Sequence, residues 1–375
     1  MGTGEAATEA SDVLLVGSLP FETAEEAFRA AGPALRGHVG WLPDGEPGPR
    51  QMWVGMLLQL VFSQHPDIEE TKAPPDHQIA ETPEQGEGAQ VAGGGDGPGK
   101  DLEGMWLFRV KPGRTLRFDD LKYGTFAQES YKVFRRLRDE GVLAPDMRFQ
   151  MSVPSPHSSI DGCFEDPTQW PEVYAAYIDG IRREIGKALE TIPAQDLVIQ
   201  WDVALEFLDM WLGEDNWLRY WPKLTAEQKF ERHAAQLDEL WQGIPEETLL
   251  GIHWCFGTWG GWPMAAMSDL DLCVRMSNEA KRRIRRPLDY VHLPVVTEPD
   301  DAFFAPLDRL DIGDTKVYLG MVHHTDGIED FRRRRDLARK HLESFGIGSV
   351  CGYGRLKPER LPDVLRIHAE DADEL

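Results

Sequence analysis

Two side chains that commonly bind zinc stand two positions apart in the second half of the chain. His253 and Cys255 flank Trp254 in the segment IHWCFG, and alternate residues of a strand point to the same side. An imidazole and a thiol on one face at a strand end are suitable first ligands for zinc. Cys351 ends another predicted strand and is expected to reach the same place. The alternative interpretation is that both cysteines are small buried residues and that His253 is a hydrogen-bonded core histidine.

Two carboxylates near the end of another apolar segment form a second candidate group. Asp202 and Glu206 belong to the segment IQWDVALEF, where they are candidates for acid/base catalysis or substrate anchoring. Both also fit a purely structural interpretation as strand-end and loop residues. Other polar or aromatic residues at predicted strand ends are expected to contact substrate: Ser18, Asp44, Glu46, Arg50, Trp254, His323, Asp326 and Arg355.

These residues must be positioned by eight short apolar segments that are predicted to be strands. The segments are residues 12–17, 36–42, 147–153, 196–203, 249–255, 288–295, 315–322 and 347–351. Strands that alternate with helical patterns predict a parallel sheet, and eight such units predict a closed (β/α)8 TIM barrel. The C-terminal strand ends of a barrel form one rim, where active sites are built. An open doubly wound sheet is the competing architecture, but no predicted strand is followed by GxGxxG or a P-loop.

Amphipathic helices are predicted between several of the strands. Their hydrophobic residues recur with helical spacing over 171–192, 225–241 and 327–346. Thr225 and Gln228 have the spacing of a capping box at a helix start, and Gly346 is a predicted helix stop.

Three segments are expected to lie outside this regular pattern. Residues 1–11 are predicted to be a disordered tail that precedes a single barrel domain over 12–375. The Gly-rich, acidic stretch 82–101 is predicted to be a flexible surface insertion. Residues 104–120 are predicted to form an added hairpin around Pro112 and Gly113.

The composition limits the classes of partner and compartment. The 375 residues include 40 Lys and Arg against 64 Asp and Glu, a formal charge of −24, which disfavours nucleic acid or an anionic membrane surface as a partner. No run of 18 apolar residues and no signal peptide is found, and four cysteines do not form a disulfide framework. We therefore expect a cytoplasmic protein with reduced cysteines and a small-molecule substrate.

Several of these segments together resemble a known family. IHWCFG, followed later by FGIGSVCGYGR, is similar to the catalytic barrel of cobalamin-independent methionine synthase, in the wider superfamily of uroporphyrinogen decarboxylase. VGSLP, IQWDVALEF and VYLGMV are also similar to that superfamily. The resemblance extends over most of residues 12–365 and implies one barrel in place of the duplicated barrels of the full synthase.

The resemblance implies a zinc ion held by His253, Cys255 and Cys351. The family adds a Glu from the next strand, but the matching strand here reads YVHLPVV, with Pro294 at about that position. His292 is a candidate replacement for this ligand, as are Glu298, water or substrate. The missing Glu indicates a branch whose substrate is not homocysteine.

The implied reaction is zinc-dependent methyl or alkyl transfer to a thiol, because zinc favours the nucleophilic thiolate at neutral pH. The donor, a folate or another methyl donor, is not identified by the sequence, and Arg50 and Arg355 are candidates for binding an anionic thiol or folate. Three alternatives remain open at this point. They are an epoxide-opening thiol transferase, a metal-free lyase or decarboxylase of the uroporphyrinogen decarboxylase type that uses Asp44, Arg50 and Asp202, and a non-catalytic binding barrel.

Overall fold

Eight parallel strands form one nearly closed sheet. The structure, a computed structural model, describes residues 11–74, 106–214, 221–258 and 262–372, so the predicted insertion 82–101 and tail residues 1–10 lie outside the described residues. The strand order around the sheet is β1 (Val13–Leu14), β10 (Gly346–Ser349), β9 (Lys316–Val322), β8 (Tyr290–Pro294), β7 (Leu249–Trp254), β6 (Leu197–Val203), β5 (Arg148–Pro154) and β2 (Trp41–Pro43). Each strand overlaps one of the eight predicted segments, and the predicted (β/α)8 barrel is confirmed.

The two end strands of this sheet, β1 and β2, are brought together by the segments beside them. The backbone N–H groups of Asp12 and Val13 both donate to the carbonyl of His38, at 2.9 Å each. Beyond the strands, Ser18 and Gly45 form a parallel bridge. The barrel therefore closes just before β1 and again at its rim, where the predicted site residues lie.

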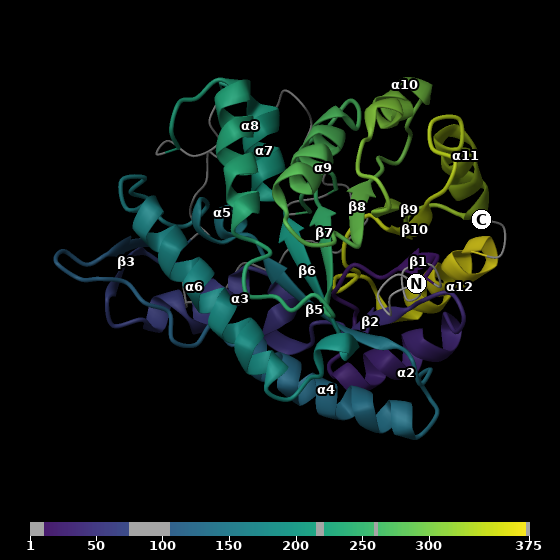
Figure 1. The fold of residues 1–375 in the computed structure, drawn as a ribbon, viewed down its shortest axis with the longest axis horizontal. Helices are drawn as coiled ribbons and strands as arrows, with labels where there is room; N and C mark the ends of the chain where they lie inside the picture. Colours follow the sequence, from purple (N-terminus) through teal and green to yellow (C-terminus); the bar gives the residue numbers. More distant parts are fainter. Residues whose placement is uncertain (1–10, 75–105, 215–220, 259–261, 373–375) are drawn as a thin grey trace.

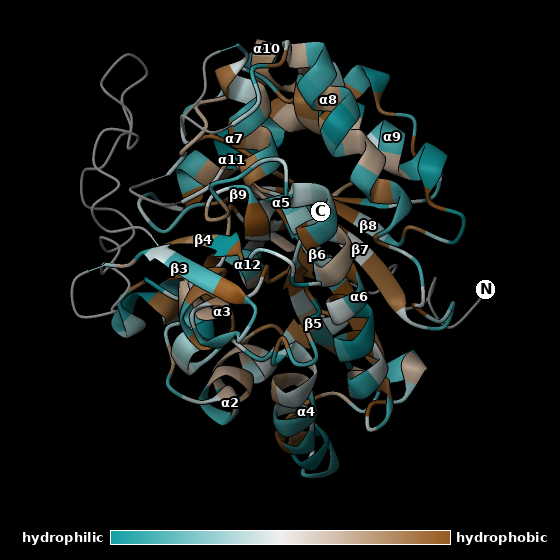
Figure 2. Ribbon diagram, turned by 90° about the vertical axis from the view of Figure 1, so that its left-hand side faces the viewer, coloured by the Kyte–Doolittle hydropathy of each residue, from teal (hydrophilic) through white to brown (hydrophobic). Residues whose placement is uncertain are grey.

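Helices surround the strands on the outside (Figure 1). They are α2 (Ala24–Ala34), α3 (Gly55–Leu60), α4 (Tyr123–Asp139), α5 (Pro156–Ile160), α6 (Trp170–Leu189), α7 (Leu205–Leu212), α8 (Ala226–Ala235), α9 (Asp271–Arg283), α10 (Asp301–Phe304), α11 (Ile328–Ala338) and α12 (Leu361–Ala372). The capping box predicted at Thr225 and Gln228 is present at the start of α8. In Figure 2 the strand labelled β7 is brown, whereas outer helices such as α4 and α8 carry teal stretches, as expected when apolar residues face the sheet.

Helix α11 is shorter than the predicted segment 327–346. It ends at Ala338, and Gly346 is the first residue of β10. A Cβ at Gly346 would lie 2.5 Å from the Tyr318 ring and 2.9 Å from the carbonyl oxygen of Asp12. Glycine is therefore required here by close packing inside the sheet, and it is not a helix stop.

The added hairpin has a different first strand from the one predicted. Strand β4 (Leu107–Val110) pairs antiparallel with β3 (Ile68–Lys72), so its partner precedes the insertion. The residues after Pro112 and Gly113 do not return along β4. Their backbone bonds elsewhere, because the N–H of Leu116 donates to the Glu172 carboxylate on α6 at 3.0 Å.

The lower part of the barrel is filled by aromatic and aliphatic side chains. Trp41 stacks on Tyr290 with ring centroids 5.1 Å apart, and Tyr318 meets both rings edge-on. Gly251 makes room for this group, because a Cβ there would lie 2.0 Å from the Tyr290 ring. This packed floor leaves the open space at the C-terminal rim of the strands.

No helix in the described part of the chain is both long enough and apolar enough to cross a membrane.

Candidate metal centre and substrate cavity

Three potential metal ligands converge at the barrel rim. His253 lies in β7, Cys255 follows that strand, and Cys351 follows β10. Their ligand atoms all lie within 4.8 Å of one another, and the two Sγ atoms are 3.7 Å apart. The N–H of Cys255 donates to the Val203 carbonyl at 2.8 Å, which continues the strand ladder and keeps Cys255 on the same side as His253.

The donor atoms of this group suit a zinc ion. Nε2 of His253 is buried and has no hydrogen-bond partner among the described residues, so this nitrogen is available as a metal ligand. The two thiols interact strongly: the contact with Cys351 raises the pKa of Cys255, and the contact with Cys255 lowers the pKa of Cys351. One imidazole and two sulfurs leave a fourth, open position, the arrangement of catalytic zinc sites.

His292 does not offer a ligand atom to this group. Its Nδ1 lies 2.7 Å from Nδ1 of His253, and burial together with the neighbouring His253 lowers the pKa of His292, so the ring is neutral. Its Nε2 is turned away toward Gly320, where a Cβ would lie 2.6 Å from that nitrogen. The structure thus places His292 behind His253, where a neutral ring can orient the His253 imidazole through this contact.

The metal-ligand group borders a cavity of about 210 Å³. Its lining includes Ser18, Glu46, Asp202, His253 and Arg355, so the structure brings these five predicted residues to one place. Cys255 and Cys351 also line this cavity. The cavity therefore joins the candidate metal centre to two carboxyl groups and one guanidinium.

The two carboxyl groups hold protons more tightly than usual. Burial, together with Asp44 and Cys351, raises the pKa of Glu46 to about 8, against the opposing effect of Arg50. Burial and the neighbouring Glu46 carboxyl raise the pKa of Asp202 well above its ordinary value. Two carboxyl groups that face one cavity disfavour each other's ionised form.

Asp202 is held from below by a glutamine. Gln200 lies two residues earlier on β6 and donates from Nε2 to Oδ1 of Asp202 at 2.9 Å, while its Oε1 accepts from the Tyr290 hydroxyl at 3.1 Å. The hydrogen bonds thus connect the aromatic floor of the barrel to the carboxyl group in the cavity.

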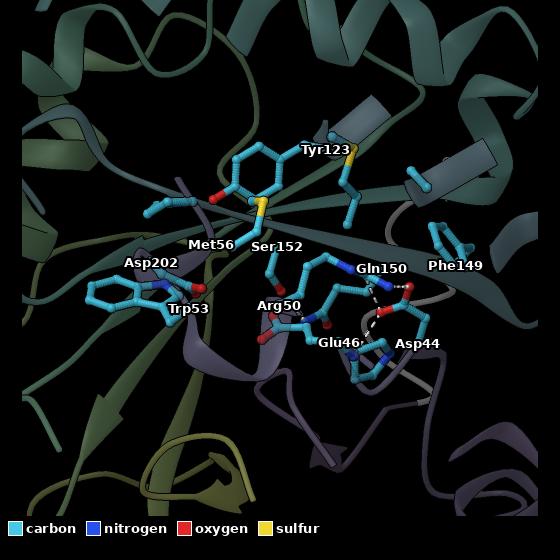
Figure 3. Close-up of a pocket in the computed structure, with 14 residues that line it drawn as sticks. Asp44, Glu46, Arg50, Trp53, Met56, Tyr123, Phe149, Gln150, Ser152 and Asp202 are labelled. Atoms are coloured by element: carbon cyan, nitrogen blue, oxygen red, sulfur yellow. Dashed lines mark hydrogen bonds and ion pairs between the residues drawn. The ribbon is translucent and has the colours of Figure 1, made fainter. Parts of the chain in front are cut away.

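Two lining residues have strained backbones. Glu46 and Trp53 have φ values of +50° and +51°, in a region that residues other than glycine seldom adopt. Such strain persists where the surroundings hold a side chain in a functional position. Figure 3 shows the Trp53 indole beside Asp202, and hydrogen bonding from Trp53 partly opposes the rise in the Asp202 pKa.

Arg50 and Asp44 are paired with each other beside the main cavity. Arg50 donates to both Asp44 oxygens, at 3.1 and 2.7 Å, and the two residues line a chamber of about 20 Å³ (Figure 3). Glu46, Trp53 and Asp202 line both spaces. The guanidinium of Arg50 therefore neutralises Asp44. Among the described residues that line the main cavity, Arg355 is the one lysine or arginine.

Ser18 and Arg355 lie together at the upper edge of the cavity. The Ser18 hydroxyl accepts from the N–H of Gly354 at 3.2 Å, and Arg355 donates to the Thr258 carbonyl at 3.1 Å. A Cβ at Gly352 would lie 2.2 Å from Ser18 Oγ. The glycines of the segment CGYGR thus let the loop after β10 approach the loop after β1.

Glu206 is placed away from the cavity. Its carboxylate accepts from Ser155 at 2.5 Å, Ser158 at 2.7 Å and Gln236 at 2.9 Å, and the residue is completely buried in α7. These bonds tie α5 and α8 to α7. The structure therefore gives Glu206 a structural position and does not bring it to Asp202 as a catalytic partner.

Three other candidates are not among the described lining residues of the cavity. Trp254 faces outward between the inward His253 and Cys255, and its Nε1 donates to Ser277 on α9 at 2.8 Å. Asp326 accepts two hydrogen bonds from the fully buried Arg334, at 2.7 and 2.9 Å. His323 is buried but does not line the cavity, and burial keeps its pKa well below the ordinary value.

Gln200, Trp53 and Trp106 are among the residues of the site that sequence reasoning missed. Gln200 could have been found, because it lies two positions before Asp202 and so shares its side of the strand. Trp53 and Trp106 line the cavity from segments outside the barrel strands, where no periodic pattern indicates the direction of a side chain.

The comparisons with known proteins show a likeness of fold. No family model and no curated protein matches this sequence. A B12-independent methionine synthase from Shewanella sp. W3-18-1, solved with selenomethionine, matches with a TM-score of 0.58 and 12% identity over 94% of this chain and 87% of that one. A putative vitamin-B12 independent methionine synthase from Listeria monocytogenes matches with a TM-score of 0.47 and 16% identity, over 70% and 71% of the two chains.

Proposed function

We propose that this protein is a zinc-dependent transferase that moves a methyl or alkyl group to the sulfur of a small thiol. The observation that carries the proposal is the convergence of His253, Cys255 and Cys351 on one point of the cavity wall. When bound there, zinc would supply Lewis acidity that favours the thiolate form of a coordinated thiol at neutral pH. The fold likeness to B12-independent methionine synthases agrees with this class of reaction.

The chemistry requires the thiol to lose its proton and the sulfur to attack carbon. The sulfur then forms the new S–C bond, and the leaving group departs with the electron pair of the bond that breaks. A thiol in this cavity would face Glu46 and Asp202, which line it, and His292 would orient His253.

The paired carboxyl groups favour a thiol that also carries an amine. Glu46 and Asp202 face the cavity together, and the nearby Arg50 is already paired with Asp44. An ammonium group between the two carboxyls would favour their ionised forms, so protons would be released on binding. We therefore propose a small aminothiol as the acceptor, with Glu46 and Asp202 as its amine-binding residues.

The same geometry weighs against the metal-free lyase or decarboxylase. That alternative assigns Arg50 to an acidic substrate, but Arg50 is bound to Asp44 at two atoms. An epoxide-opening thiol transferase uses the same metal chemistry and differs only in the electrophile, so it remains a form of the proposed function.

The test uses the full-length protein loaded with Co²⁺, whose visible spectrum reports each new sulfur ligand. We expect cysteamine and 2-mercaptoethanol both to change the spectrum, with cysteamine binding at least about tenfold more tightly because of its amine. Asp202→Asn should remove most of that difference and leave 2-mercaptoethanol binding unchanged. A spectrum that neither thiol changes would overturn the proposed reaction, and equal affinity for both thiols would overturn the amine site.

A further inference from the structure

Part of the cavity wall is apolar. We call it the apolar end and define it by six lining residues: Trp53, Val54, Leu58, Trp106, Cys163 and Leu205. None of them carries a formal charge at neutral pH in its ordinary state. The charged lining residues of the cavity are Glu46, Asp202 and Arg355, and the Trp53 indole borders Asp202.

The added hairpin and the short helices after β2 and β5 build this end. The N–H of Phe108 in β4 donates to the Cys163 carbonyl at 2.8 Å, and Phe108 and Phe164 form a parallel bridge. The ring of Phe62, which follows α3, meets the Phe108 and Phe164 rings at centroid distances of 5.8 and 5.3 Å. This aromatic cluster fixes α3, β4 and the residues after α5 relative to one another.

Space at the apolar end depends on a glycine in its wall, Gly162. A Cβ at Gly162 would lie 3.2 Å from Cδ1 of Leu205 and would extend into the same wall. The wall of the cavity therefore combines a small residue, Gly162, with the large side chains of Trp53 and Trp106.

The polar atoms of this wall are already bonded to protein partners. The Trp106 indole donates to Glu70 at 3.1 Å, and the Cys163 thiol donates to the Ser159 carbonyl at 3.2 Å. The hydroxyls of Ser158 and Ser159, which also line the cavity, donate to Glu206 at 2.7 Å and to the Ser155 carbonyl at 2.9 Å. A ligand at this end consequently meets carbon and sulfur surfaces and gains few new hydrogen bonds.

We infer that the apolar end binds the substrate that carries the alkyl group, and that it selects a neutral, apolar electrophile over an anionic donor. A charged group buried there would lose its hydration without a compensating partner, whereas an apolar group would gain from burial against two indole rings. The assignment of this ligand as the alkyl donor rests on the proposed function, but the binding preference is a property of the wall itself.

The test compares two aryl fluorides of similar size by 19F NMR, with 4-fluorotoluene as the neutral probe and 4-fluorobenzoate as the anionic probe. Leu58→Trp should fill the apolar end, and Leu60→Trp is the matched control, because Leu60 lies on the same helix, is also partly buried, and does not line the cavity. Binding at the apolar end is defined as the part of the signal that Leu58→Trp removes. Thermal melting of both variants shows that each is folded.

We expect the wild-type protein and Leu60→Trp to bind 4-fluorotoluene and Leu58→Trp to bind it at least about tenfold more weakly. Any binding of 4-fluorobenzoate should be the same in Leu58→Trp as in the wild type. Cys255→Ser, which disrupts the candidate metal centre, should bind 4-fluorotoluene as the wild type does, so loss of the metal and failure of the apolar end give separate results. Equal binding of both probes at this end, or unchanged 4-fluorotoluene binding in Leu58→Trp, would overturn the inference.

Discussion

Replacing His292 should weaken metal binding without touching a metal ligand. If Nε2 of His253 binds the metal, its Nδ1 must carry the proton and donate it to Nδ1 of His292, 2.7 Å away. His292→Leu keeps a similar volume but removes that acceptor, and it leaves the N–H of His253 without its buried partner. Loss of such a supporting hydrogen bond typically costs 10- to 100-fold in metal affinity, or about 1.4–2.8 kcal/mol at about 1.4 kcal/mol per tenfold change.

A second variant separates the hydrogen bond from packing. His292→Asn places its side-chain oxygen where Nδ1 of the imidazole stood, so it can still accept from His253. We expect zinc affinity, measured by competition with a chromophoric chelator, to fall 10- to 100-fold in His292→Leu and to remain within a few-fold of the wild type in His292→Asn.

A buried histidine elsewhere supplies the control for general destabilisation. His368 on α12 is completely buried, bonds to the Val364 carbonyl at 2.9 Å and does not line the cavity. His368→Leu should lower the melting temperature and leave zinc affinity unchanged. The reasoning is refuted if His292→Leu binds zinc as the wild type does, or if the Asn and Leu variants at that position are equally weak.

Three further predictions concern stability. Asp209→Ala should lower the free energy of unfolding, measured with urea, by about 3–5 kcal/mol, because the fully buried Lys229 loses the carboxylate 2.8 Å away. A decrease of less than about 1 kcal/mol would contradict this prediction. In metal-free protein, burial raises the pKa of Glu46 in the folded state to about 8, above its ordinary 4.5. The folded state therefore keeps a proton that the unfolded state releases, and stability falls as pH rises between those two values. Glu46→Gln should raise the melting temperature more at pH 8 than at pH 5, and an equal rise at both pH values would be evidence against the raised pKa. Gly251→Ala should destabilise the protein by about 1–3 kcal/mol, because the added methyl group clashes with the ring of Tyr290. Gly186→Ala in α6, where the space around the glycine is open, should stabilise it by about 0.5–1 kcal/mol. Changes of the same sign in both variants would show that the packing argument fails.

The barrel could be predicted because its strands are apolar runs that alternate with helical patterns. Spacing also placed His253, Cys255 and Asp202 toward one cavity, since alternate residues of a strand share a side. The same rule should have turned Trp254 outward, because it lies between His253 and Cys255, and the structure places it against α9.

The remaining errors come from long-range partners, which spacing along the chain does not specify. Glu206 is held by serines about 50 positions earlier and by Gln236 on another helix. Asp326 accepts a hydrogen bond from Arg334, whose buried side chain turns inward from α11. A polar residue at a strand end therefore has a predicted location, but its partners emerge only when distant segments pack together.

The zinc content of the full-length protein tests the central claim most directly. The protein is loaded with zinc, dialysed against a weak chelator and analysed by mass spectrometry, beside Cys255→Ser and Cys351→Ser variants whose folding is checked by circular dichroism. The geometry of His253, Cys255 and Cys351 predicts about one zinc per chain in the wild type and less than about a tenth of that in either folded variant. A wild-type protein that retains no zinc, or cysteine variants that retain as much as the wild type, would contradict the account.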